Sequence, residues 1–124
     1  MFIVGAGSAT PPNRFTQAEC WEALVASKEF PALPGRSKAI LKKVLLGENG
    51  IDSRYLAFDR LEEAFAIDPD TLHRRFAKHA PVVAAEAARR ALANAGKTIE
   101  EIDALFISTC TGYLCPGLTS YVSE

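Results

Sequence analysis

The stretch that decides the fold is residues 103–118, DALFISTCTGYLCPGL. Every position from Ala104 to Ile107 is apolar, so both faces of an extended backbone there would carry apolar side chains. That pattern is typical of a strand in a parallel sheet that is covered on both faces. A turn-rich loop follows, and residues 118–124 then predict the first turns of a helix. The stretch therefore predicts strand, loop and helix in an α/β arrangement.

Helix signals dominate the chain upstream of this stretch. Helices are predicted for residues 17–30, 37–46 and 71–95. Thr16 and Glu19 form a capping box for the first helix, and Thr98 and Glu101 offer a second box for a short turn. The third helix is predicted to start at Asp68, to kink just before Pro81 and to end at Gly96.

Extended segments are predicted at two further places. Residues 2–6, FIVGA, predict a buried strand that enters a turn. Residues 51–58 predict a strand or an extended segment. Neither repeats nor a low-complexity linker occur, so residues 1–124 are expected to form one α/β region.

Charge and cysteine usage exclude several classes of protein. The chain has 14 Lys+Arg against 15 Asp+Glu, which argues against a polybasic partner of nucleic acid or of membrane surfaces. No apolar run approaches the roughly 20 residues that span a bilayer, and the N-terminus lacks a basic signal-peptide region. Three cysteines are an odd number, and free thiols are the default in the cytosol. A soluble, cytoplasmic protein is expected.

Three possible sites have competing structural interpretations. Gly5-Ala6-Gly7 lacks the third glycine of a dinucleotide fingerprint, so a simple turn is favoured. Cys110 and Cys115 lack the further ligands that a metal site needs, and catalytic activation of either thiol would need a base or a cation. Lys42 and Lys43 suit an anionic ligand such as a phosphate, although a solvated helix surface is the simpler interpretation.

The loop in residues 103–118 resembles the N-terminal region of type III polyketide synthases, the chalcone and stilbene synthase family, and its Thr-Gly-Tyr-x-x-Pro-Gly-Leu form is similar to the bacterial members. The opening Gly-x-Gly-x-Ala-x-Pro, the motif Gly50-Ile51-x-x-Arg54-Tyr55 and the Ala-rich helix that runs into Gly96 agree in order. The resemblance therefore covers essentially the whole chain.

The resemblance implies the N-terminal part of a thiolase-like, layered α/β fold, in an enzyme that is a homodimer. Such an enzyme loads an acyl-CoA starter onto a cysteine and extends it with malonyl-CoA by decarboxylative Claisen condensation. Its substrates are CoA thioesters, and no separate cofactor is implied. The catalytic Cys, His and Asn of the family would lie beyond residue 124, so no catalytic residue is assigned here and this chain alone is expected to be inactive.

The resemblance also implies substrate-binding residues. Thr109, Cys110 and Thr111 fall where the family's strand end borders the acyl pocket. Cys115 falls where one residue reaches across the dimer into the partner's cavity.

The CoA phosphates of this family are held by basic residues on the helix before the Arg-Tyr motif. In an ungapped count those positions are Leu41, Val44 and Glu48, which are not basic. Lys42 and Lys43 are the expected substitutes, with Lys38 as a further possibility.

Two other interpretations remain open from the sequence. One is a non-catalytic, thiolase-like module for binding or dimerisation, which would use the loop at a protein interface. The other is part of a ketosynthase of fatty-acid type, which shares the order of strand, helix and Gly-rich loop.

Overall fold

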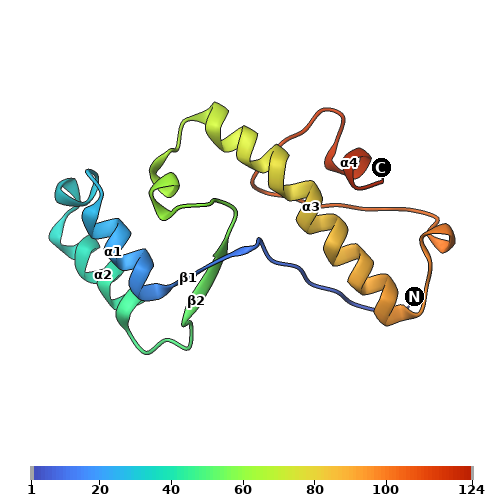
Figure 1. Cartoon of the computed structure of the whole chain (residues 1–124), viewed down its shortest axis with the longest axis horizontal. Helices are drawn as coiled ribbons and strands as arrows, with labels where there is room; N and C mark the ends of the chain where they lie inside the picture. The colour runs from blue at the N-terminus through green and yellow to red at the C-terminus, as the bar shows by residue number, and fades with distance from the viewer. Residues whose placement is uncertain (1, 124) are drawn as a thin grey trace. The chain divides into compact units, whose positions relative to one another are not determined.

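The computed structural model describes residues 2–123 (Figure 1). The elements are β1 (Asn13–Thr16), α1 (Gln17–Ala26), η1 (Phe30–Ala32), α2 (Gly35–Leu46), β2 (Ser53–Leu56), η2 (Leu61–Phe65), α3 (Pro69–Ala95), η3 (Ile99–Glu101) and α4 (Leu118–Ser123), where η marks a 3-10 helix. They form two compact units. The inserted unit is Pro11–Ile67, and the α3 unit combines the residues up to Thr10 with those from Asp68 onward. No change in amino-acid composition marks the division between the two units.

A two-stranded antiparallel ribbon organises the inserted unit. β1 pairs with β2 in a register that sets Asn13 opposite Leu56 and Thr16 opposite Ser53. The predicted capping box is confirmed, because the Glu19 carboxylate accepts a bond of 2.7 Å from the Thr16 N–H and the Glu19 N–H donates to Thr16 Oγ1. The Thr16 N–H and the Thr16 hydroxyl both donate to the Glu19 carboxylate and lower its pKa. Strand β2 lies within the segment predicted at 51–58 and confirms it as a strand, whereas β1 was not predicted.

Helices α1 and α2 pack against each other, and α1 is shorter than predicted. It ends at Ala26, because both the N–H and the hydroxyl of Ser27 bond to the Leu24 carbonyl oxygen. Pro31 follows and lacks the N–H that a continuing helix would use. The Trp21 and Phe30 rings then meet edge to face at 5.7 Å.

The long helix α3 has both predicted ends. The Asp68 carboxylate accepts a bond of 2.9 Å from the Thr71 N–H, and Gly96 takes a left-handed φ of +63° just after the last turn. The helix continues through Pro81 without a break. The predicted box at Thr98 is also confirmed, at the start of η3.

Two strand predictions are wrong. Residues 2–6 and 104–107 belong to no strand in the structure. A strand requires a neighbour for its N–H and C=O groups, and the described residues supply none, since neither segment makes a backbone–backbone hydrogen bond within them. An apolar pattern predicts where a strand could form, but strand pairing depends on a neighbouring segment that the pattern cannot reveal.

Within residues 2–123, no helix is both long enough and apolar enough to cross a bilayer.

Candidate functional site

The predicted acyl-pocket loop is fastened to the α3 unit at two points. Leu114 is 7% exposed, which is unusually low in this chain. Gly112 lies against the ring of Phe76 on α3, so closely that any side chain at 112 would overlap the ring. The Cys115–Pro116 peptide bond is cis, and α4 begins at Leu118. The loop is therefore held in place between the end of the extended segment and α4.

The four predicted substrate-binding residues are all exposed on this loop. The Thr111 N–H donates to Thr109 Oγ1 at 3.3 Å, and Cys110 Sγ lies 3.7 Å from Thr111 Oγ1. Thr109, Cys110 and Thr111 therefore form one local group of hydroxyls and a thiol, while Cys115 follows the buried Leu114. Among the described residues, neither thiol has an imidazole or an ammonium group as a hydrogen-bond partner.

The third cysteine, Cys20, lies on α1 and is half-buried. Burial raises the pKa of its thiol, despite the opposing effect of Arg54. Cys20 therefore stays protonated at neutral pH, as expected of a packing residue.

The predicted phosphate-binding lysines lie on α2, in the inserted unit. Lys42 and Lys43 are exposed. Lys38 is committed elsewhere, because its ammonium donates to the Pro31 carbonyl oxygen at 3.0 Å and lies 5.2 Å from the centre of the Phe30 ring. Of the three lysines considered, Lys42 and Lys43 are thus the better placed for an anion. These two lysines lie in the inserted unit and the loop lies in the α3 unit.

A buried polar contact joins β2 to both helices of the inserted unit. The Gln17 side chain is accessible to only 6%, accepts a bond of 3.0 Å from Arg54 Nε and donates to the Val44 carbonyl oxygen at 3.3 Å. Arg54 is part of the Gly-Ile-x-x-Arg-Tyr motif, so in this structure the motif arginine acts as a structural tie. Sequence reasoning missed Gln17, since a single glutamine at a helix start gives no signal of burial. Leu114 was also missed, although it is the one aliphatic residue between Gly112 and Cys115.

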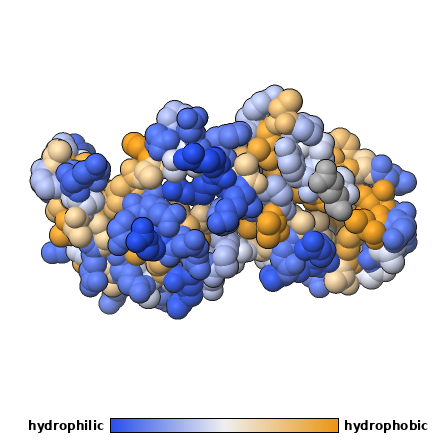
Figure 2. All heavy atoms as spheres, turned by 45° about the horizontal axis from the view of Figure 1, so that its top comes forward, coloured by the Kyte–Doolittle hydropathy of each residue, from blue (hydrophilic) through white to orange (hydrophobic). Residues whose placement is uncertain are grey.

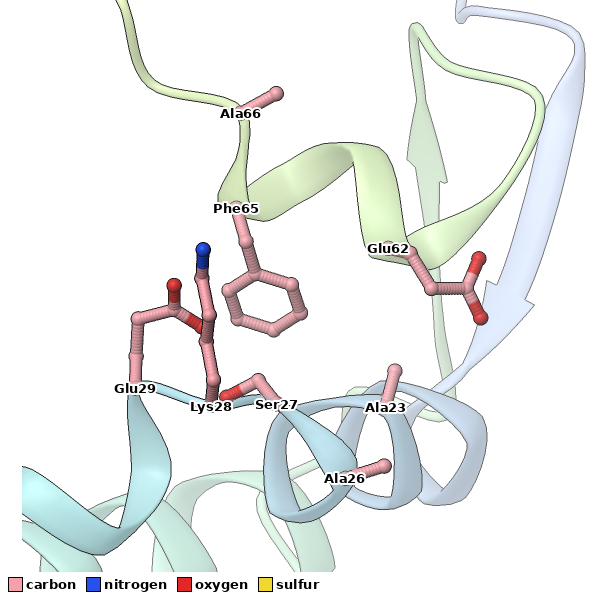
Figure 3. Close-up of a pocket in the computed structure, with 8 residues that line it drawn as sticks. All are labelled: Ala23, Ala26, Ser27, Lys28, Glu29, Glu62, Phe65 and Ala66. Carbon is pink, nitrogen blue, oxygen red and sulfur yellow. The ribbon is translucent and has the colours of Figure 1, made fainter.

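A cavity of about 400 Å³ lies between the C-terminal end of α1 and η2 (Figure 3). It is lined by Ala23, Ala26, Ser27, Lys28, Glu29, Glu62, Phe65 and Ala66. In the close-up the Phe65 ring points toward α1, and charged side chains stand at the edge. None of the residues predicted to bind substrate lines this cavity.

A metal centre has no candidate among the described residues, because no three His, Cys, Asp or Glu side chains in that part of the chain come together.

Comparisons with known proteins give two relatives. Bisdemethoxycurcumin synthase from Oryza sativa subsp. japonica is 30% identical over 129 residues, which cover 94% of this chain and 30% of the rice protein. The crystal structure of PKS-I from the brown alga Ectocarpus siliculosus matches with a TM-score of 0.75 at 25% identity, over 97% of this chain and 34% of the algal one. No protein-family model matches. The chain spans about a third of the length of these relatives.

The structural match identifies the fold as the α/β, thiolase-like fold that the sequence predicted. With the rice relative, it also shows the family: the chain belongs to the type III polyketide synthases. Both relatives are eukaryotic, so the resemblance to bacterial members stays a prediction.

Proposed function

We propose that residues 1–124 are the N-terminal, thiolase-like region of a type III polyketide synthase that condenses an acyl-CoA starter with malonyl-CoA. The observation that carries this proposal is the likeness to the rice synthase, which extends over 94% of the chain. In the proposed reaction a cysteine thiolate attacks the starter thioester and CoA leaves as its thiolate. Malonyl-CoA then loses CO₂, and the resulting carbanion attacks the acyl group and releases the cysteine. The residues that perform these steps belong to the remainder of the enzyme.

In this proposal the loop contributes part of the acyl pocket. Thr109, Cys110 and Thr111 supply a short wall of hydroxyls and a thiol, and Cys115 supplies a small side chain to the cavity of the partner in a homodimer. Their exposure in this structure supports the assignment, since a pocket wall must be accessible to substrate. Small side chains at Cys110 and Cys115 leave room for a longer acyl chain.

Lys42 and Lys43 are proposed to contact the CoA phosphates. Both are exposed, and Lys38 is already engaged by a carbonyl oxygen and a ring. Ammonium groups bind phosphate as point charges and tolerate varied geometry. Because CoA thioesters are cytosolic metabolites, we also place the enzyme in the cytoplasm.

A chimera tests the proposal. This chain would replace the matched part of the rice synthase, and product formation from malonyl-CoA and an acyl-CoA would be followed by chromatography and mass spectrometry. We expect a product from the chimera and none from residues 1–124 alone. A correctly folded, dimeric chimera without any product would contradict the proposal, and so would a product from the isolated chain.

Substitutions in the chimera refine the assignment. Cys110→Phe is expected to shorten the acyl chains that are accepted while KM for malonyl-CoA stays unchanged. The single variants Lys42→Gln and Lys43→Gln are each expected to raise KM for CoA thioesters, with Lys28→Gln as the control of equal charge change. An equal rise of KM in the control would mean that the effect comes from the loss of positive charge in general, and it would contradict a specific contact with the CoA phosphates.

A further inference from the structure

Helix α2 carries Lys42 and Lys43 near its C-terminal end, and this end has no left-handed backbone cap. The helix ends at Leu46, and Gly47 follows with a φ of −81°, whereas many helices close on a glycine of positive φ. The Gly47 N–H bonds to the Lys43 carbonyl oxygen at 3.0 Å. Among the described residues, no backbone N–H from the following segment reaches the next carbonyl oxygen, that of Val44. The end of α2 therefore needs donors from side chains.

Two side-chain amides donate to the Val44 carbonyl oxygen. Gln17 Nε2 donates at 3.3 Å across 27 residues of sequence, and Asn49 Nδ2 donates from the segment just after the helix. A carbonyl oxygen has two lone pairs, so it accepts both bonds. Asn49 can move together with the end of α2, whereas Gln17 belongs to α1. Gln17 is therefore the amide that fixes the end of α2 relative to the rest of the inserted unit.

Gln17 is itself held on two further sides. Its backbone N–H donates to the Asp52 carbonyl oxygen at 3.0 Å, and its Oε1 accepts from Arg54 Nε at 3.0 Å. The bond from the guanidinium is charge-assisted and hence stronger than a neutral one. Only 6% of Gln17 is exposed, so water competes little for these bonds. Together they hold the side chain in one orientation, with Nε2 directed at α2.

The two lysines are next to the carbonyl group that Gln17 holds. Lys43 directly precedes Val44, and Lys42 lies one position earlier. Both are exposed, and Figure 2 shows hydrophilic residues over much of the visible surface of the inserted unit. A loose last turn would spread the two ammonium groups over many positions, and that freedom would be lost when they bind an anion. Fixing the turn in advance therefore favours binding.

We infer that Gln17 is a positioning residue for CoA thioesters: its amide holds the Val44 carbonyl oxygen and so fixes the turn of α2 that presents Lys42 and Lys43 to the CoA phosphates. The inference rests on the proposed contact between these lysines and CoA. Gln17 acts through the lysines and touches no reacting atom, so its loss changes KM and leaves kcat unchanged. Substrates that lack the CoA phosphates do not depend on it.

A matched pair of substitutions isolates the bond to α2. Gln17→Glu keeps an oxygen that accepts from Arg54 Nε, but its carboxylate has no proton to donate to the Val44 carbonyl oxygen. Asn13→Asp makes the same change from amide to carboxylate in the same unit, where the Asn13 amide donates to the Phe58 carbonyl oxygen at 2.9 Å and does not contact α2. The two variants add equal negative charge. Gln17→Leu removes the amide without adding charge and checks the result.

Amide hydrogen exchange on residues 1–124 tests the effect on the helix. Gln17→Glu is expected to speed exchange of the amides of residues 45–47 by about threefold or more relative to those of α1. Asn13→Asp is expected to leave this ratio unchanged. An unchanged ratio in both Gln17 variants overturns the inference, and so does an equal change in the Asn13 control.

Kinetics of the rice chimera test the effect on substrate. The same acyl group would be supplied as its CoA thioester and as its N-acetylcysteamine thioester, which lacks the phosphates. Gln17→Glu and Gln17→Leu are expected to raise KM for the CoA thioester about threefold to tenfold, with kcat and the KM for the N-acetylcysteamine thioester unchanged. Asn13→Asp should change neither constant. Equal rises of KM for both thioesters would show a merely structural role and overturn the inference.

Lys43→Gln separates this inference from the proposed function. If Gln17 acts through the lysines, Gln17→Leu raises KM by a smaller factor in the Lys43→Gln background than in the unsubstituted chimera. An equal factor in both backgrounds overturns the inference. Unchanged KM in both Lys42→Gln and Lys43→Gln overturns the proposed phosphate contact and the inference with it. A rise in the lysine variants without a rise in the Gln17 variants overturns the inference alone.

Discussion

The inserted unit and the α3 unit use extended chain in opposite ways. In the inserted unit β1 and β2 satisfy each other in a closed antiparallel ribbon, and the Gln17 N–H adds a bond of 3.0 Å to the Asp52 carbonyl oxygen. In the α3 unit two segments with stronger apolar character remain unpaired within the described residues. Apolar character alone therefore does not make a strand, and the presence of a neighbour decides whether a strand forms.

Helices are equally well formed in both units. Thr16 caps α1 and Asp68 caps α3, whereas α2 starts after Pro34 without a side-chain cap. Helical hydrogen bonds are local, so a helix needs no distant partner to satisfy its backbone. The difference between the units therefore lies in their non-local contacts.

The largest effect is expected at the close contact between the N-terminal segment and α3. Gly7→Val would force a branched side chain into the α3 backbone, at a cost of about 3 kcal/mol in the free energy of unfolding. Urea unfolding followed by circular dichroism measures it. Gly35→Ala is the control, because nothing lies within 4 Å of that position. An unchanged midpoint for Gly7→Val would show that the contact does not exist in solution.

A smaller effect is expected inside the inserted unit. Gln17→Leu removes the acceptor of Arg54 Nε, while the Val44 carbonyl oxygen keeps its bond from the Asn49 side-chain amide, and the change should cost about 2 kcal/mol. Trp21 fluorescence during urea unfolding reports this unit. Asn94→Leu removes an amide in the α3 unit and should leave the Trp21 transition unchanged. If both variants shift it equally, the two units do not unfold separately.

The next effect is the loss of stability when one phenylalanine in each unit is replaced by serine. Phe58 is half-buried and stacks on Phe15 with ring centres 6.3 Å apart, so Phe58→Ser should cost about 1 to 2 kcal/mol. Phe106→Ser should change stability by less than about 0.5 kcal/mol, because the ring is almost fully exposed. Denaturant midpoints of the two variants measure the contrast. Similar losses would mean that Phe106 is buried in solution.

The smallest effect is a pH dependence at the start of α3. The Thr71 backbone N–H bonds to the Asp68 carboxylate and lowers its pKa in the folded state. A lowered pKa in the folded state stabilises the helix above the unfolded value of about 4, and this stabilisation is lost as the pH falls through the folded pKa. Asp68→Asn keeps an oxygen acceptor and should remove this part of the pH dependence. Circular dichroism titration of both proteins checks the difference between them, and identical curves would contradict the assignment.

Sequence reasoning predicted the fold where the interactions are local. The capping boxes at Thr16 and Thr98 and the left-handed Gly96 were all found from residue types and spacing. The strand β1 was missed, because Asn13 and Arg14 lack apolar character and the strand exists only through its pairing with β2. The strand predictions at 2–6 and 104–107 failed for the converse reason.

The same difference between local and distant contacts decides how much of the candidate site the sequence predicts. The family resemblance selected the loop residues, whereas the charge of Lys42 and Lys43 already made these two lysines candidates for an anion. The commitment of Lys38 to the Pro31 carbonyl oxygen depends on the turn at η1. The buried Gln17 contacts Val44 and Arg54, which are far away in sequence. Residue spacing in the sequence predicts neither kind of contact.

Amide hydrogen exchange on the isolated chain and on the rice chimera tests the central claim most directly. The amides of residues 2–6 and 102–107 should exchange near their intrinsic rates in the chain alone and about 100-fold or more slowly in the chimera, while the β1–β2 amides should change little. Equal exchange of both segments in the two proteins would contradict the account that the lack of a neighbour is what keeps them from forming strands.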